Sequence, residues 1–169
     1  MEGRRRRWFL GALMIGGIHA TCTSVAAQDP GDHVRIWMDM GISVAAGKEV
    51  DTSAGLLVQL ALQKRQHRAM LRGLFLMTDA KRSNNAIGEL GVLFGRARRG
   101  RYGHAAISTG VSLVALDYCP GPCRTVGVPI VAELTFQAAF LGAGLQTFCN
   151  LNPKALYGGV ALSLQLGWI

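Results

Sequence analysis

The last fifteen residues of the chain, 155–169, alternate between two kinds of side chain almost without exception. Large apolar residues occupy every second position, and the positions between them hold small or mildly polar residues, poor in Lys and Glu. A period of two is typical of a β-strand, because successive side chains point to opposite faces. A soluble sheet usually presents charged side chains to water. This pattern instead predicts a strand with lipid on one side and a packed polar interior on the other.

The N-terminal segment has the composition of an export signal. Arg4–Arg7 form a basic stretch, Trp8–Ala20 form an apolar stretch, and Val25-Ala26-Ala27 fits the small-residue cleavage rule. A membrane anchor is the alternative, but the apolar stretch is shorter than the ~20 residues that a spanning helix needs. We therefore predict a signal peptide at residues 1–27 and one mature domain at residues 28–169.

Charge and hydrophobicity restrict the class of the mature domain. Residues 28–169 hold 14 Lys and Arg against 9 Asp and Glu, a net charge of +5. Nucleic acid is not expected as a partner of an exported chain, so we attribute the basic excess to outer-membrane lipid and lipopolysaccharide phosphates. The mature domain has no long, charge-free apolar run, which excludes a helical membrane protein.

The two-residue alternation recurs along the chain and predicts eight strands. The connections between them alternate in length, with polar, longer ones near residues 47–54, 78–85, 118–125 and 150–154. An even number of antiparallel strands closes with both termini at one side, short turns in the periplasm and longer loops outside. The sequence thus predicts an all-β, eight-stranded antiparallel up-and-down transmembrane β-barrel, with strands at residues 34–45, 55–64, 68–77, 86–96, 102–116, 126–138, 141–149 and 155–169.

Residues 53–80 also fit a second interpretation. This segment is rich in Leu, Ala, Gln, Lys, Arg and Met, which are strong helix formers. The turn expected at residues 63–67 contains no Gly, Pro, Asn or Asp, unlike a typical hairpin turn. The segment is either two strands or one amphipathic helix, and a helix would leave only six strands.

The inward face collects charges of both signs. Because buried charges must be paired, they predict an interior ion network. If residues 78–85 turn one strand into the next, Glu89 lies opposite Leu74 and diagonal to Arg72, within reach of a long side chain. About eight strands leave an interior only wide enough for side chains, so we favour a solid plug over a conduction path. The network residues are Arg35, Asp39, Arg68, Arg72, Glu89 and Glu133.

The mature cysteines are candidates for a disulfide, because export permits oxidation. Cys119 and Cys123 flank Pro-Gly-Pro in one predicted outer loop, and Cys149 falls at the same end of the barrel. We predict a Cys119–Cys123 bridge, although Cys149 can pair with either partner. The Cys-x₃-Cys spacing is not the Cys-x₂-Cys of redox enzymes and zinc ribbons.

Catalytic and metal sites find little support in the sequence. His33, His67 and His104 all map to the predicted periplasmic end, and their spacing is not that of a metal site. Ser108 lies four residues along the strand from His104, too far for a direct hydrogen bond. We expect no enzyme, no cofactor and no metal.

The pattern as a whole resembles the small eight-stranded outer-membrane barrels of the OmpA/OmpX type. The resemblance rests on the signal, the alternating strands, the polar core and the C-terminal Leu164-Gln165-Leu166-Gly167-Trp168-Ile169. It implies a protein of the bacterial outer membrane with a structural, envelope or surface-interaction role and no catalysis. The alternative is a soluble periplasmic lipocalin-like barrel that binds an apolar ligand with its greasy face turned inward. Candidates for an aromatic girdle are Phe94, Tyr118, Phe136, Phe148, Tyr157 and Trp168.

Overall fold

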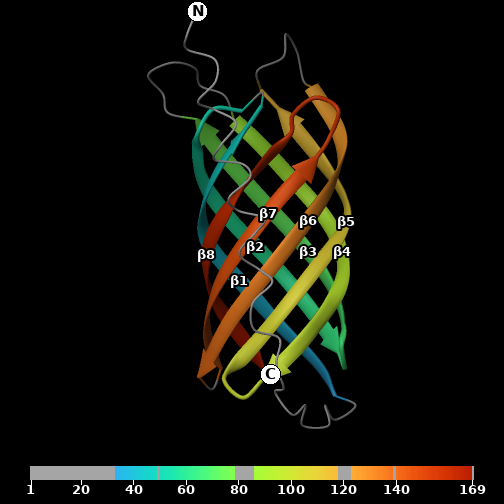
Figure 1. Ribbon diagram of the computed structural model, residues 1–169, viewed down its shortest axis with the longest axis vertical. Coiled ribbons are helices and arrows are strands. Elements are labelled where there is room, and N and C mark those ends of the chain that lie inside the picture. The colour runs from blue at the N-terminus through green and yellow to red at the C-terminus, as the bar shows by residue number, and fades with distance from the viewer. Residues whose placement is uncertain (1–32, 49, 79–85, 118–122, 139, 169) are drawn as a thin grey trace, which may run out of the picture.

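The computed structural model describes residues 33–48, 50–78, 86–117, 123–138 and 140–168, and these form a closed barrel (Figure 1). Each strand pairs antiparallel with the next, and β1 pairs with β8, so the predicted eight-stranded up-and-down barrel is confirmed. Among the described residues, no helix is long and apolar enough to cross a membrane. The strands are β1 (Val34–Gly47), β2 (Ser53–Lys64), β3 (His67–Thr78), β4 (Ala86–Gly100), β5 (Gly103–Leu116), β6 (Cys123–Ala138), β7 (Leu141–Leu151) and β8 (Tyr157–Trp168).

The two ends of the barrel differ. At the lower end in Figure 1, two residues separate β2 from β3, two separate β4 from β5, and two separate β6 from β7. We call this the turn end, and the opposite end the loop end. β1 begins and β8 ends at the turn end, where Ile36 pairs with Trp168. Several strands run further than the sequence pattern indicated, β4 to Gly100 and β6 from Cys123.

Residues 53–78 are two strands, so the amphipathic-helix alternative for residues 53–80 is wrong. Lys64 pairs with His67, and the hairpin closes through Arg65 and Gln66 alone. Arg65 takes a φ of 55°, in the left-handed region that Gly and Asn enter more readily. Pairing with β1 and β4 on either side, together with burial of one face, outweighs the helix propensity of the segment.

The outer surface is apolar and the interior is polar. Ile42 is 66% exposed and Leu162 is 61% exposed, whereas Gln146 and Gln165 are fully buried inside the barrel. A lipocalin-like barrel requires the reverse, with its apolar face turned in around a ligand. The lipocalin-like alternative is therefore wrong for this chain.

The aromatic girdle differs from its prediction. Phe148 and Tyr157 point into the barrel, 5% and 1% exposed, while Phe94 and Phe136 point outward. The Tyr118 and Trp168 side chains lie outside the described part of the structure. Alternation continues through β7 and β8, and it places positions 148 and 157 on the same inward face as Gln146 and Gln165. Exposed Tyr102 and Phe140, which the prediction missed, join Phe136 at the turn end.

Glycine on the inward face allows the neighbouring strand and its side chains to approach closely. A Cβ on Gly95 of β4 would collide with the backbone oxygen of Ile107 and lie 2.7 Å from the Cα of Ser108, both on β5. Gly88, on the outward face of the same strand, would meet only the Cβ of Ala115, at 4.0 Å.

Gly95→Ala should therefore destabilise the barrel by about 1–3 kcal/mol, because the backbone of β5 must move to relieve the overlap. Gly88→Ala, the matched control in β4, should leave the free energy of unfolding nearly unchanged. Urea titration of both variants, folded in the same detergent, measures the difference. Equal midpoints for the two variants would contradict the packing described.

Candidate functional site

The carboxylate of Glu133 on β6 is the centre of one buried polar cluster. It accepts hydrogen bonds from Arg68 Nη2 at 2.9 Å, Thr135 Oγ1 at 3.0 Å and Gln146 Nε2 at 3.1 Å, and it lies 3.1 Å from His104 Nε2. The donors come from β3, β5, β6 and β7. We call these residues the Glu133 cluster. Four donors around one carboxylate provide the pairing that a buried charge needs.

Arg68 connects the Glu133 cluster to β1. Its guanidinium Cζ lies 5.1 Å from the centroid of the Trp37 ring, and Nη2 lies 4.0 Å from Asp39 Oδ2. Trp37 in turn contacts His104 with ring centroids 5.3 Å apart. Arg68 therefore contacts both β6 and β1 across the lumen, because its long side chain spans the narrow interior.

A second cluster surrounds Glu89 of β4, toward the loop end. Arg72 Nη1 donates to Glu89 Oε1 at 2.6 Å, and the hydroxyl of Tyr157 donates to Glu89 Oε2. The Arg72 guanidinium lies over the ring of Phe148, with Cζ 4.6 Å from its centroid. The side chains of the ion pair are fully buried. We call these four residues the Glu89 cluster.

Five of the six residues predicted for the interior network lie in or beside these two clusters. Leu74 pairs with Glu89 in the register, which puts Glu89 diagonal to Arg72 as the sequence indicated. Arg35 lies apart, and the described residues offer it no carboxylate partner. The network is thus two separate clusters and one outlying arginine rather than a single chain of charges.

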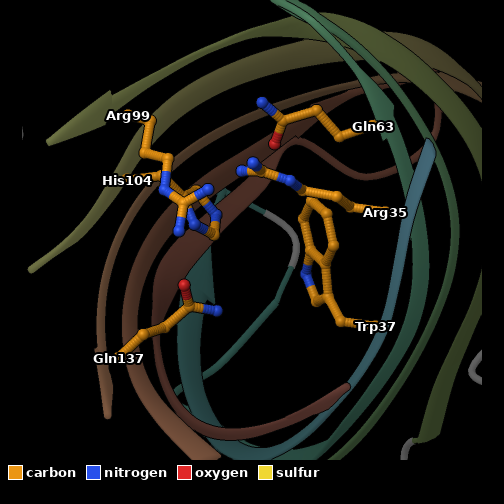
Figure 2. Close-up of a pocket in the computed structure, with 6 residues that line it drawn as sticks. All are labelled: Arg35, Trp37, Gln63, Arg99, His104 and Gln137. Carbon is orange, nitrogen blue, oxygen red and sulfur yellow. The ribbon is translucent and has the colours of Figure 1, made fainter. Parts of the chain in front are cut away.

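Arg35 lines a small cavity at the turn end (Figure 2). The guanidinium group of Arg35 points toward the guanidinium group of Arg99 and the ring of His104. The amides of Gln63 and Gln137 lie on either side. The cavity measures about 10 Å³, room for about one water molecule. The described lining holds cationic, amide and aromatic groups and no carboxylate.

Several residues of the clusters were not assigned to them from the sequence. From the sequence, His104 is considered only as a catalytic or metal-binding residue, and Phe148 and Tyr157 are candidates for an aromatic girdle. The partners of Tyr157 and Arg68 lie on strands that are not their neighbours in the sheet, β4 and β6. Inward alternation indicated that these side chains would be buried, but not which ones would meet across the lumen.

The cysteines are placed only in part. Cys149 on β7 carries a free thiol among the described residues, and Lys154 Nζ lies 3.1 Å from Cys123 Sγ. Cys119 lies outside the described residues, so the Cys119–Cys123 disulfide stays a prediction.

The described histidines lie at the turn end, where the sequence placed them. His104 pairs with Glu133 and packs against Trp37. No group of three or more His, Cys, Asp or Glu side chains in the described ranges is arranged to hold a metal ion.

Solved structures with the same fold are small outer-membrane barrels. Neisserial surface protein A matches with a TM-score of 0.59 at 9% identity, covering 80% of this chain and 97% of that one. Ail, the attachment invasion locus protein of Yersinia pestis, matches with the same values. Its complex with the heparin analogue sucrose octasulfate gives a TM-score of 0.58 at 9% identity, over 80% of this chain and 99% of that one. No protein-family model and no curated protein sequence matches the chain. At this identity the likeness is one of fold, that of the small eight-stranded outer-membrane barrels.

The Arg72–Glu89 pair should be energetically coupled. Arg72→Met or Glu89→Gln alone leaves a buried charge without its partner, which costs about 3–5 kcal/mol. The double variant should recover part of that loss. A double-mutant cycle by urea unfolding measures the coupling, with the exposed Arg124→Gln as a control that should change little. Strictly additive effects would show that the two side chains do not interact.

Proposed function

We propose that this protein is an integral β-barrel of the bacterial outer membrane, exported through a signal peptide at residues 1–27. Its role is structural, in the envelope or in surface interaction, and it performs no catalysis. The observation that carries this proposal is the polarity of the barrel, apolar outside and polar inside. If the barrel were in water, this arrangement would expose the apolar face of every strand to solvent.

The apolar belt is continuous around the barrel. Each strand contributes at least one large apolar side chain that is more than a third exposed, and the strands are joined in a closed ring. Monomeric soluble proteins rarely carry contiguous apolar surface of this extent. Closure also leaves no unpaired strand edge, which hydrocarbon would not tolerate. Members of the belt are Ile42, Leu56, Leu71, Leu90, Leu113, Ile130, Leu145 and Leu162.

The interior supports a plug rather than a pore. Trp37, Arg72 and Tyr157 are among the largest fully buried side chains, and they project into a barrel of eight strands. A barrel of this size has an interior just wide enough for side chains to fill. The packed clusters also engage His104 and both central carboxylates, Glu89 and Glu133, in contacts that fix them in place.

The loop end is the side that a surface role would use. In the proposed orientation this end of the barrel faces outward, toward lipopolysaccharide. Neisserial surface protein A and Ail share the fold, and Ail has been solved with a sulfated heparin analogue. These neighbours support a surface-interaction role.

Leu162→Arg tests the membrane placement. Leu162 is 61% exposed in the middle of β8, and a charge at mid-bilayer costs about 2–4 kcal/mol. Leu141→Arg, at the first residue of β7 on the turn-end rim, should cost about 0–1 kcal/mol. We expect Leu162→Arg to reduce folding into lipid vesicles and outer-membrane recovery, while Leu141→Arg behaves like the wild type. Wild-type protein recovered in the soluble periplasmic fraction would refute the proposal.

Purified protein in planar bilayers should show no stable, large conductance. We expect the large side chains packed in the narrow lumen to block a continuous water path. A porin added to the same bilayer serves as the positive control. Reproducible porin-sized current steps from the wild-type protein would overturn the plugged interior in favour of a channel.

A further inference from the structure

We propose that the β4–β5 hairpin binds the phosphate headgroups of anionic phospholipids in the leaflet at the turn end. The binding groups are the guanidinium groups of Arg96, Arg98 and Arg101, which we call the basic collar. This inference rests on the proposed membrane placement and deepens it, because it assigns a lipid class to one face of the barrel.

The position of the basic collar follows from the outward face of β4. Going toward the turn end, that face presents Leu90, Val92 and Phe94, which are 57%, 50% and 63% exposed. The next two outward positions are Arg96 and Arg98, both exposed. An abrupt change from apolar to cationic side chains on one lipid-facing stripe marks the level where hydrocarbon ends and headgroups begin.

Among the described residues, the immediate neighbours of the basic collar supply no negative charge. Arg96 pairs with His67 on β3 and Ile107 on β5, and Arg98 pairs with Ala105. Arg101 lies over the ring of Tyr102, with Cζ 5.2 Å from the ring centroid. None of these neighbours is a carboxylate.

Acidic side chains are confined to other places in the described part of the chain. Asp39, Glu89 and Glu133 are buried in the barrel, and Asp51 and Asp117 lie at the loop end. In the sequence, the turn segments 64–67 and 96–102 hold six Lys and Arg and no Asp or Glu, while residues 28–33, which precede β1, hold two Asp, so six positive charges are set against two negative ones. Four basic residues (Lys or Arg) and four acidic residues (Asp or Glu) occur in the loop-end connections 48–52, 79–85, 117–122 and 152–156. The excess of positive charge therefore belongs to the turn end.

The chemistry of the basic collar fits a lipid phosphate. A guanidinium group presents paired donors that match phosphate oxygens, and it carries its charge at every physiological pH. Exposed Tyr102 has the amphipathic ring that is enriched at membrane interfaces. A zwitterionic headgroup brings its own ammonium group, which repels the collar, so a net anionic phospholipid is preferred. Lipopolysaccharide would lie at the opposite end of the barrel in the proposed orientation.

Competitive lipid retention tests the inference. Protein folded in detergent receives equal amounts of phosphatidylglycerol and phosphatidylcholine with identical chains, and native mass spectrometry counts the lipids retained. We expect a clear preference of the wild type for phosphatidylglycerol that weakens with salt. The double variant Arg96→Gln, Arg98→Gln should lower that preference about tenfold or more, because each arginine near an anionic lipid surface contributes appreciably to the free energy of binding. Arg96→Lys with Arg98→Lys should keep most of it.

The matched control is Arg124→Gln, which removes an exposed arginine from the loop end and should leave the preference unchanged. The inference would be overturned if this control lost the preference for phosphatidylglycerol. It would also be overturned if inorganic phosphate, at the same concentration as the lipid, displaced phosphatidylglycerol from the wild type. Folding into vesicles is measured separately for each variant. Wild-type protein that folds into vesicles but retains both lipids equally overturns this inference alone, whereas failure to fold into vesicles overturns the proposed function.

Discussion

The pairing of β1 with β8 is the constraint on which the rest of the structure depends. It joins the first strand to the last, from Ile36 with Trp168 to Gly47 with Tyr157, so each described strand has two hydrogen-bonded neighbours. An open sheet of the same strands would have two edges whose backbone groups water, but not lipid, can satisfy. Closure also fixes the diameter, because a ring of eight strands encloses only a narrow lumen.

A narrow lumen explains the composition of the inward face. Bulky Trp37 fits because its neighbour on β8 is Gly167, where an added Cβ would lie 2.6 Å from the Cβ of Trp37. Charged side chains in so small a volume must meet partners of opposite sign, and Glu133 and Glu89 each do so with an arginine from β3. Because these partners come from several strands, the clusters tie opposite walls of the barrel together. The contacts of Arg68 with Glu133 and of Tyr157 with Glu89 join strands that are not adjacent, so these two contacts depend on the closed shape of the barrel.

The sequence predicted the features that depend on local alternation, namely the strand faces and the pairing of neighbouring strands. It did not predict the side-chain contacts that depend on closure of the barrel. The faces of the strands and the pairing of Leu74 with Glu89 follow from a period of two and the position of a turn. The approach of Arg68 to Glu133 depends on how far the strands are staggered around the ring, which no short stretch of sequence encodes. The hairpin at Arg65 lacks the usual turn residues, so its signal was weak. Tyr157 was misassigned because aromatic residues suit both a membrane interface and a filled lumen.

The apolar belt has a consequence for how such a chain evolves. In the proposed membrane placement, an outward position of the belt requires only that its side chain be apolar, so Leu, Ile, Val, Met and Phe can replace one another there at small cost. Nearly half of each strand is therefore free to drift, and the inward positions are held by volume and charge pairing that other combinations of residues can also satisfy. Two barrels of common architecture can thus lose detectable similarity long before they lose their shape. An identity of 9% beside a TM-score of 0.59 shows how different two sequences with this fold can be.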